Sequence, residues 1–246
     1  MIGFAESQPL ALVYKGPGSC VEIPQNIGCS ESAAEMAKRA GFRVEYVGPK
    51  ETSFEVFKDA KVWIQPGGRA RLQVLNMAPE LKKNIAQFVS EGGGYVGFCA
   101  GAFLAADQFG WEDPEKPENN FESKGLGIVP GYGHYINFFG KKVAEIIPVI
   151  WGDSKRDVYW EEGPYFLEQK NYAPGTEIVA YYPFEFKETK ARPIMSLNTS
   201  YKKGRVAITS VHPEAPQEWR EYYKITDNDG LDYNLAVDMI KWSAAK

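Results

Sequence analysis

The sequence is short of the residue types that mark several common classes of protein. Lysine and arginine together number 28 against 32 aspartates and glutamates, so we expect no surface for nucleic acid or for an anionic membrane. No apolar run reaches the roughly 18 residues that cross a bilayer. Two histidines and three cysteines occur without a C-x-x-C or H-E-x-x-H pattern, and we expect no metal site. No G-x-G-x-x-G follows a predicted strand, which argues against a dinucleotide cofactor.

The N-terminal segment bears on where the protein is located. The stretch "MIGFAESQPLALVYKG" lacks the basic region and the long apolar region of a signal peptide, so the cytoplasm is the default expectation. Export is the alternative, because "IGFAES" also fits the tail of a trimmed signal. The chain has 246 residues, 44% of them apolar, with no repeat and no low-complexity linker. We therefore expect one domain over residues 1–246 with a sizeable core.

Strand and helix patterns alternate through the first half of the chain. Short apolar strands are expected at 10–14, 42–48, 60–65 and 94–98, and helices at 30–41, 78–93 and 100–110. Ser30 is the expected N-cap of the first helix. Such alternation implies right-handed crossovers and a parallel sheet that is covered on both faces.

In the second half of the chain, strand and helix patterns no longer alternate. Residues 111–125 are polar and broken by proline, and we expect a solvated loop there. From residue 126 to 210, short strands with antiparallel or mixed pairing follow, and residues 233–246 are expected to form a closing amphipathic helix. The predicted fold class is therefore α/β. It is a three-layer α/β/α sandwich with a flavodoxin-like, mainly parallel sheet and extra antiparallel strands in the second half.

Residues 97–101 read G-x-C-x-G at the junction of a predicted strand and a predicted helix. This is the pattern of a nucleophile elbow with cysteine in place of serine. Gly97 and Gly101 flank Cys99 where a Cβ would clash, and the start of a helix favours the thiolate over the thiol. Cys99 is therefore a candidate nucleophile. The alternative is a structural cysteine buried in a tight turn.

His212 is the candidate base for this thiol. It follows an apolar strand in "VAITSVHPE", and Glu214, two residues later, points the same way if the segment is extended. Glu214 can then hold one ring nitrogen while the other faces the thiol. The alternative is a loop histidine beside a chance glutamate. We interpret His134, in "GYGHYINFFGKK" without a nearby carboxylate, as a loop histidine.

A glycine loop ends the predicted strand in "VWIQPGG", residues 62–68. Gly67 and Gly68 expose backbone N–H groups with no side chain in the way. Together with the N–H of Ala100 they can form an oxyanion hole, although P-G-G is equally the sequence of a simple turn.

The cysteines allow two states. Cys20 and Cys29 are close enough in sequence to form a disulfide, which would leave Cys99 single. Three reduced thiols are the alternative.

A strand that ends in P-G-G, then G-x-C-x-G and then a late H-P-E resembles the class I glutamine amidotransferase-like superfamily. More closely, the chain is similar to stand-alone bacterial relatives of the N-terminal domain of eukaryotic-type biotin protein ligases. The similarity runs from about residue 11 to residue 214. The stretches that carry it are "VYKGPGSC", "GCSESAA", "YVGPKE", "VWIQPGG", "GGGYVGFCAGAFLA", "EEGPYF" and "VHPE".

The resemblance implies roles for particular residues. Cys99 is the nucleophile, His212 the base and Glu214 the residue that orients it, with the P-G-G glycines and Ala100 as oxyanion donors. Phe103 stands near the place where many glutaminases of the superfamily carry a substrate-contacting glutamine. In the family, residues 158–166 approach the mouth of the active site, so the candidate substrate contacts are Phe103, Glu161, Glu162 and Tyr165. A solvated hairpin is the alternative for residues 158–166.

Cys20 and Cys29 lie in stretches that the relatives share. The resemblance therefore favours a disulfide that ties the first loop to the first helix.

The expected function is that of a cysteine-dependent amidohydrolase or amidotransferase-like enzyme. It acts on a small amide through the triad Cys99–His212–Glu214 and a thioester intermediate, chemistry that needs no cofactor. The expected partners are a small-molecule substrate and a separate synthase or acceptor protein. The alternative is a non-catalytic ligand-binding or regulatory domain that retains the fold.

Overall fold

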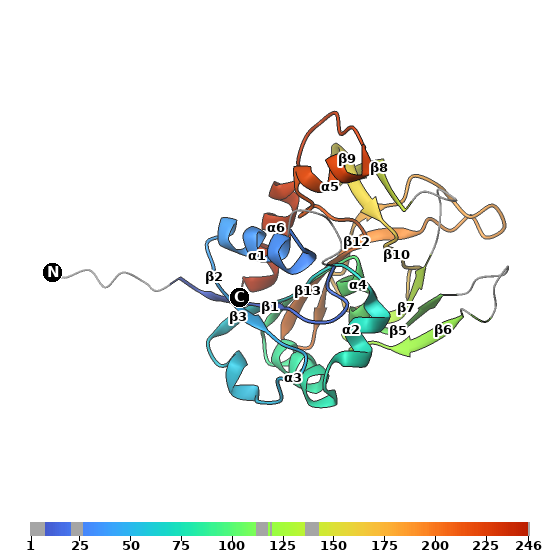
Figure 1. Ribbon diagram of the computed structural model, residues 1–246. Coiled ribbons are helices and arrows are strands. Elements are labelled where there is room, and N and C mark those ends of the chain that lie inside the picture. The colour runs from blue at the N-terminus through green and yellow to red at the C-terminus, as the bar shows by residue number, and fades with distance from the viewer. Residues whose placement is uncertain (1–7, 21–26, 112–117, 119, 136–142, 246) are drawn as a thin grey trace.

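The structure is a computed structural model in which residues 8–20, 27–111, 118, 120–135 and 143–245 are described. Within these residues, nine strands form one sheet in the order β2-β1-β3-β4-β13-β12-β11-β8-β9 (Figure 1). The parallel half contains β2 (Arg43–Val47), β1 (Leu10–Tyr14), β3 (Ala60–Gln65), β4 (Gly94–Phe98) and β13 (Gly204–Thr209). The antiparallel half continues from β13 through β12 (Ile194–Tyr201), β11 (Glu177–Tyr181), β8 (Ala144–Trp151) and β9 (Ser154–Glu161).

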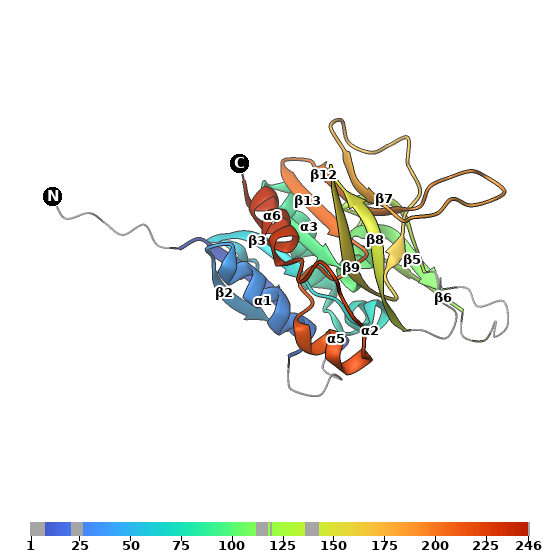
Figure 2. The ribbon, with the colours of Figure 1, turned by 90° about the horizontal axis from the view of Figure 1, so that it is seen from above.

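Helices cover both faces of the parallel half (Figure 2). One face is covered by α1 (Cys29–Arg39) and α6 (Tyr233–Ala244), and the other by α2 (Ala70–Asn76), α3 (Pro79–Ser90) and α4 (Ala100–Ala105). Strand β1 shows why both faces need cover. Leu12 and Tyr14 belong to the core beneath α3, whereas Ala11 and Val13 belong to the core beneath α1 and α6. The predicted three-layer α/β/α class is confirmed.

Four described strands form a second, smaller sheet in the order β10-β7-β5-β6. They are β5 (Ala106–Trp111), β6 (Phe121–Lys124), β7 (Val129–Tyr135) and β10 (Pro164–Tyr165). Two predictions were therefore wrong: the helix expected over 100–110 ends at Ala105, and the loop expected over 111–125 contains β6. Gly110 permits this sheet, because a Cβ there would overlap the hydroxyl of Tyr132 and the carbonyl of Phe121.

Helix α1 begins one residue before the predicted cap. Gly28 is its N-cap, and the hydroxyl of Ser30 instead donates to the Tyr14 carbonyl at 2.8 Å, which ties the helix to the end of β1. The helix α5 (Gln217–Tyr223) and the 3-10 helix η1 (Phe54–Phe57) were not predicted.

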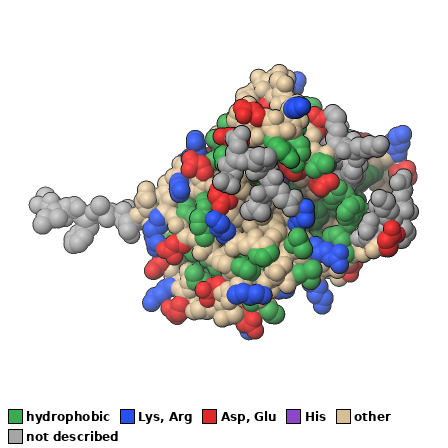
Figure 3. All heavy atoms as spheres, in the orientation of Figure 1, with side chains coloured by type: hydrophobic (Ala, Val, Ile, Leu, Met, Phe, Trp, Pro, Cys, Tyr) green, Lys and Arg blue, Asp and Glu red, His purple; other side chains and the backbone are tan. Residues whose placement is uncertain are grey.

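Two further features concern the surface. None of the helices in the described ranges combines the length and the apolar content needed to cross a membrane. On the face seen in Figure 3, acidic and basic side chains are interspersed and do not gather into one large patch.

The packing of α3 leads to a prediction about stability. Leu81 is completely buried in the core, so Leu81→Ala is expected to lower the free energy of unfolding by about 2–5 kcal/mol. Leu75 on α2 is 65% exposed, and Leu75→Ala is expected to change it by less than about 0.5 kcal/mol. Denaturant unfolding followed by circular dichroism measures both. Equal losses in the two variants would contradict the assignment of Leu81 to the core.

Candidate active site

Three loops meet at one edge of the parallel half of the sheet. Strands β3, β4 and β13 are neighbours and run in the same direction. The glycine loop follows β3, the turn with Cys99 follows β4, and the segment with His212 and Glu214 follows β13. Because the carboxyl ends of parallel strands lie at the same edge of a sheet, motifs far apart in the sequence come together there.

Cys99 lies at a sharp turn between β4 and α4. Its backbone has φ 46° and ψ −100°, which is strained for a residue with a side chain. A Cβ on Gly97 would lie 2.5 Å from the carbonyl oxygen of Gly101, and a Cβ on Gly101 would overlap the carbonyl of Gln65. The N–H of Cys99 donates to the Thr209 carbonyl at 2.8 Å, which fixes the turn against β13. This is the geometry that a nucleophile elbow requires.

The helix that follows the elbow is six residues long, shorter than predicted. Its dipole therefore supports a thiolate less than the predicted longer helix would. The N–H groups of Ala102 and Phe103 donate to the Cys99 carbonyl at 2.9 and 3.2 Å, so the amides of Ala100 and Gly101 precede the first helical hydrogen bonds. Ala100 thus keeps the position that an oxyanion donor occupies after the nucleophile. That role stays a prediction.

His212 and Glu214 form a buried pair beside the elbow. His212 Nδ1 lies 2.9 Å from Glu214 Oε1, and the two side chains are 3% and 0% exposed. The N–H of His212 donates to the Tyr159 carbonyl at 2.8 Å. The rings of Tyr159 and Trp219 stand edge-on to the imidazole, with centroids at 6.0 and 5.4 Å. These contacts fix the orientation of the ring with Nδ1 on Glu214.

Opposing effects act on the protonation of His212. Burial disfavours the imidazolium, whereas the negative charges of Glu214 and of a Cys99 thiolate, together with hydrogen bonds to both side chains, favour it. The net result is a pKa of His212 well above its usual value. The imidazole is therefore charged at neutral pH when the thiolate is present.

The glycine loop lies against the imidazole. A Cβ on Gly67 would overlap His212 Cε1 and would lie 3.2 Å from Cys29 Sγ. Gly68 has φ 118°, and a Cβ on it would overlap the carbonyl of Gly18. Of the two, Gly68 lines the pocket at the site, whereas Gly67 lies beneath the imidazole. Their role as oxyanion donors stays a prediction.

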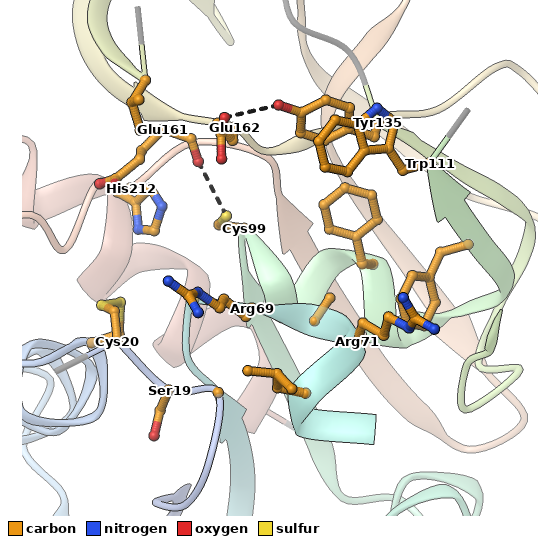
Figure 4. Close-up of a pocket in the computed structure, with 18 of the residues that line it drawn as sticks. Ser19, Cys20, Arg69, Arg71, Cys99, Trp111, Tyr135, Glu161, Glu162 and His212 are labelled. Carbon is orange, nitrogen blue, oxygen red and sulfur yellow. Dashed lines mark hydrogen bonds between the residues drawn. A yellow bond between two sulfur atoms is a disulfide. The ribbon is translucent and has the colours of Figure 1, made fainter. Parts of the chain in front are cut away.

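Cys99 opens into a pocket of about 660 Å³. Figure 4 shows Cys99 and His212 below Glu161 and Glu162, with Arg69 beneath Cys99 and with Arg71 on the other side of the view, below Trp111 and Tyr135. The predicted residues that line it are Gly68, Cys99, Phe103, Glu161, Glu162, His212 and both Cys20 and Cys29. The structure thus brings most of the predicted site residues to one cavity.

Glu161 contributes its backbone and its carboxylate to the pocket wall. Its carbonyl oxygen accepts a hydrogen bond from Cys99 Sγ at 3.4 Å. The hydroxyls of Tyr159 and Tyr223 donate to its two carboxylate oxygens at 3.0 and 2.9 Å. The carboxylate therefore braces β9 against α5, while the carbonyl orients the thiol.

Glu162 turns the chain after β9 with φ 50°. Its carboxylate accepts a hydrogen bond from the Tyr135 hydroxyl at 2.9 Å. Burial raises the pKa of Glu162 above its usual value, and the negative charge of Glu161 raises it further. The hydrogen bond from Tyr135 and the positive charge of Arg69 act in the opposite direction. Glu162 lines the pocket, and its role as a substrate contact stays a prediction.

Tyr165 does not line the pocket with the other candidates. It lies on β10, and its ring stacks on His134 at 4.8 Å and packs against Phe186 at 5.2 Å. His134 itself lies on β7 within the smaller sheet, so its interpretation as a loop histidine was wrong. The predicted substrate contact of Tyr165 finds no support in this position.

A disulfide joins Cys20 and Cys29, and both cysteines line the pocket (Figure 4). It links the loop after β1 to the first residue of α1. Cys99 is the free cysteine. The disulfide holds the wall of the pocket that faces the elbow.

Several residues of the site were not predicted. They include Arg69, Arg71, Trp111, Tyr135 and Tyr223. No short motif contains them, since they reach the pocket from α2, the smaller sheet and α5. The aromatic residues that flank the paired carboxylates in "VYWEEGPYF" were the available signal for Tyr159.

Comparisons with known proteins agree with this architecture. The family model for the N-terminal part of biotin-protein ligase matches residues 10–241. The chain belongs to this family. A biotin–protein ligase of Schizosaccharomyces pombe is 26% identical over 165 residues, which is 63% of this chain and 26% of the ligase. The family member therefore spans about a quarter of the ligase that it matches.

Solved structures with the same fold include a glutamine amidotransferase. A crystal structure of a glutamine amidotransferase aligns with a TM-score of 0.54 at 19% identity, over 87% of this chain and 96% of that one. The structure of PurLQS from Thermotoga maritima aligns with a TM-score of 0.57 at 16% identity, over 96% and 98%. At these identities the likeness establishes an amidotransferase-like fold.

The contact between Gly67 and the imidazole yields a second prediction. In Gly67→Ala the new Cβ displaces His212 from Glu214, so alkylation of Cys99 by iodoacetamide at pH 6 is expected to slow at least about tenfold. Mass spectrometry measures the rate. Gly48→Ala is the control, because a Cβ there has nothing within 4 Å. Equal rates in the two variants would show that the imidazole does not activate the thiol.

Proposed function

We propose that this family member is a cysteine-dependent amidohydrolase that acts on a small amide through Cys99, His212 and Glu214. The observation that carries the proposal is the buried His212–Glu214 contact of 2.9 Å beside a strained cysteine on the wall of a pocket. The amidotransferase-like fold supports the same class of chemistry.

The proposed reaction begins from the ion pair in which the Cys99 proton lies on His212. The thiolate attacks the carbonyl carbon of the amide, a C–S bond forms, and the carbonyl electrons move onto the oxygen. The N–H groups of Ala100 and Gly68 are the proposed donors to this oxyanion. When the C–N bond breaks, His212 gives its proton to the leaving amine, which leaves a thioester on Cys99.

The second half of the reaction releases the acyl group. His212, now neutral, takes a proton from a water that attacks the thioester, and the thiolate leaves with a carboxylic acid as product. Glu214 holds Nδ1 throughout and stabilises the imidazolium. An amine from a separate synthase or acceptor protein in place of water gives the transferase form of the same reaction.

The dimensions of the pocket support a small-molecule substrate. Its volume of about 660 Å³ lies within the range of about 300–1,000 Å³ that is typical of ligand sites. Glu162 and Arg69 place charges of opposite sign beside the reactive thiol, so polar groups of a substrate find partners there.

The raised pKa of His212 gives the proposal a pH signature. A raised pKa keeps the imidazole protonated at pH 6, where it stabilises the thiolate. We expect iodoacetamide to alkylate Cys99 at pH 6 at least about tenfold faster than N-acetylcysteine, since a free thiol ionises near pH 8.5. Mass spectrometry measures both rates.

Matched variants test the roles in the triad. His212→Gln and Glu214→Gln are each expected to lower the rate at pH 6 at least about tenfold. His134→Gln removes the other histidine, and Glu221→Gln removes an exposed carboxylate near the site; neither is expected to change the rate more than about twofold. A wild-type thiol that reacts only near pH 8.5 would instead favour the non-catalytic, ligand-binding alternative.

Turnover is tested by a hydrolysis screen over a library of small amides. Wild-type protein is expected to release an acid, together with an amine or ammonia, from at least one class of amide. The substitution Cys99→Ser is expected to lower the rate of this hydrolysis at least about a thousandfold. Mass spectrometry of wild-type protein quenched in acid should show the acyl mass on Cys99. Equal turnover by the two proteins would rule out the proposed nucleophile.

A further inference from the structure

The pocket has two ends of different chemistry. Cys99, His212 and the two carboxylates Glu161 and Glu162 form the polar end. The other end is lined by apolar side chains that come from α2, α4 and the smaller sheet: Leu72, Phe103, Phe109, Trp111 and Phe121. We call this set the apolar end. Figure 4 shows Trp111 and Tyr135 on the far side of the cavity from His212.

The side chains of the apolar end support one another. The rings of Phe103 and Phe109 have centroids 5.7 Å apart, and those of Phe109 and Phe121 are 6.4 Å apart. The Trp111 ring packs on Tyr135 at 4.7 Å. These rings form a preorganised wall, because two of its members, Phe103 and Phe109, are buried and held in place by the surrounding packing.

Leu72 shows that this wall still has apolar surface to bury. Its side chain lines the same pocket as the rings and is 40% exposed. The nearby guanidinium of Arg71 lies 4.8 Å above the Phe121 ring and is engaged with that ring. An apolar group placed against Leu72 and the rings therefore leaves water without displacing a charge.

We infer that the amide substrate carries a bulky aromatic or branched apolar group that occupies the apolar end while its carbonyl meets Cys99. The inference rests on the proposed function for the position of the carbonyl. It follows from the continuity of the pocket, since one cavity contains both the thiol and the aromatic wall. Compact, wholly polar amides leave this end empty and are expected to be poor substrates.

The test compares two alkylating agents with the same reactive carbon, iodoacetamide and N-benzyl-2-iodoacetamide. In both reactions the Cys99 thiolate forms a C–S bond, the C–I bond breaks and iodide leaves. For the protein, we divide the rate with N-benzyl-2-iodoacetamide by the rate with iodoacetamide. Dividing this ratio by the same ratio for N-acetylcysteine isolates the contribution of the benzyl group. We expect this quotient to be at least about ten, which reflects burial of one aromatic ring.

Two leucines on the same helix provide matched variants. Leu72→Gln puts an uncharged polar group into the apolar end and is expected to lower the quotient at least about threefold. Leu75 is 65% exposed and does not line the pocket, so Leu75→Gln should leave the quotient and the rate with iodoacetamide unchanged. Equal effects in the two variants would overturn the inference.

A measurement on the wild-type protein needs no variant. N-benzylacetamide, which cannot alkylate, is expected to protect Cys99 from iodoacetamide at millimolar concentration, while acetamide at the same concentration is not. Slow alkylation by iodoacetamide at pH 6 would count against the proposed function. Fast alkylation at pH 6 with a quotient near one and no protection would overturn only the present inference.

Discussion

The close approach of β4 and α4 is the constraint on which the site depends. The chain can reverse within a few residues only because Gly97 leaves room for the backbone of Gly101, and Gly101 leaves room for the backbone of Gln65. The Tyr95 hydroxyl adds a 2.7 Å hydrogen bond to the Gly101 carbonyl, and the whole junction is buried. The strain at Cys99 is therefore maintained by packing on every side. The result is a thiol that stands at the edge of the sheet without being free to rotate away from it.

The position of His212 depends on a second set of contacts. The H-P-E segment continues into α5, where the buried Arg220 donates to the Ala215 carbonyl at 2.9 Å and to Asp227 at 2.7 Å. Trp219, which packs on the imidazole, donates from its ring nitrogen to the Ile27 carbonyl at 2.9 Å. The loop with His212 is thus joined to the segment before α1 and to the residues after α5. The same helix supplies Tyr223 to the pocket wall, so one element supports both sides of the site.

The central elements could be predicted because the apolar residues of their sequences indicate that they are buried. The strands at 10–14, 60–65 and 94–98 are mainly apolar, as buried parallel strands are, and the structure has them with the predicted bounds. The motifs with Cys99 and His212 followed from local rules, namely small residues at a tight turn and a carboxylate two residues after a histidine. Parallel order then brings them together.

The smaller sheet could not be predicted in the same way. Ala106 to Trp111 continues a helical pattern in the sequence, and its strand conformation depends on pairing with β6 and β7. Such pairing is a non-local interaction that overrides local preference. Apart from Phe103 on α4, the aromatic residues that line the pocket from helices and strands belong to this sheet and to α5. This explains why residues beside the thiol were found and the opposite wall was not.

The glycine positions have a consequence for related sequences. The backbone contacts at Gly97 and Gly101 are needed for the turn to close, whether or not any reaction takes place. A relative with serine or alanine at position 99 would therefore still require both glycines. These two glycines follow from the architecture of the turn, whereas the side chains at positions 99, 212 and 214 are the ones on which the proposed reaction depends.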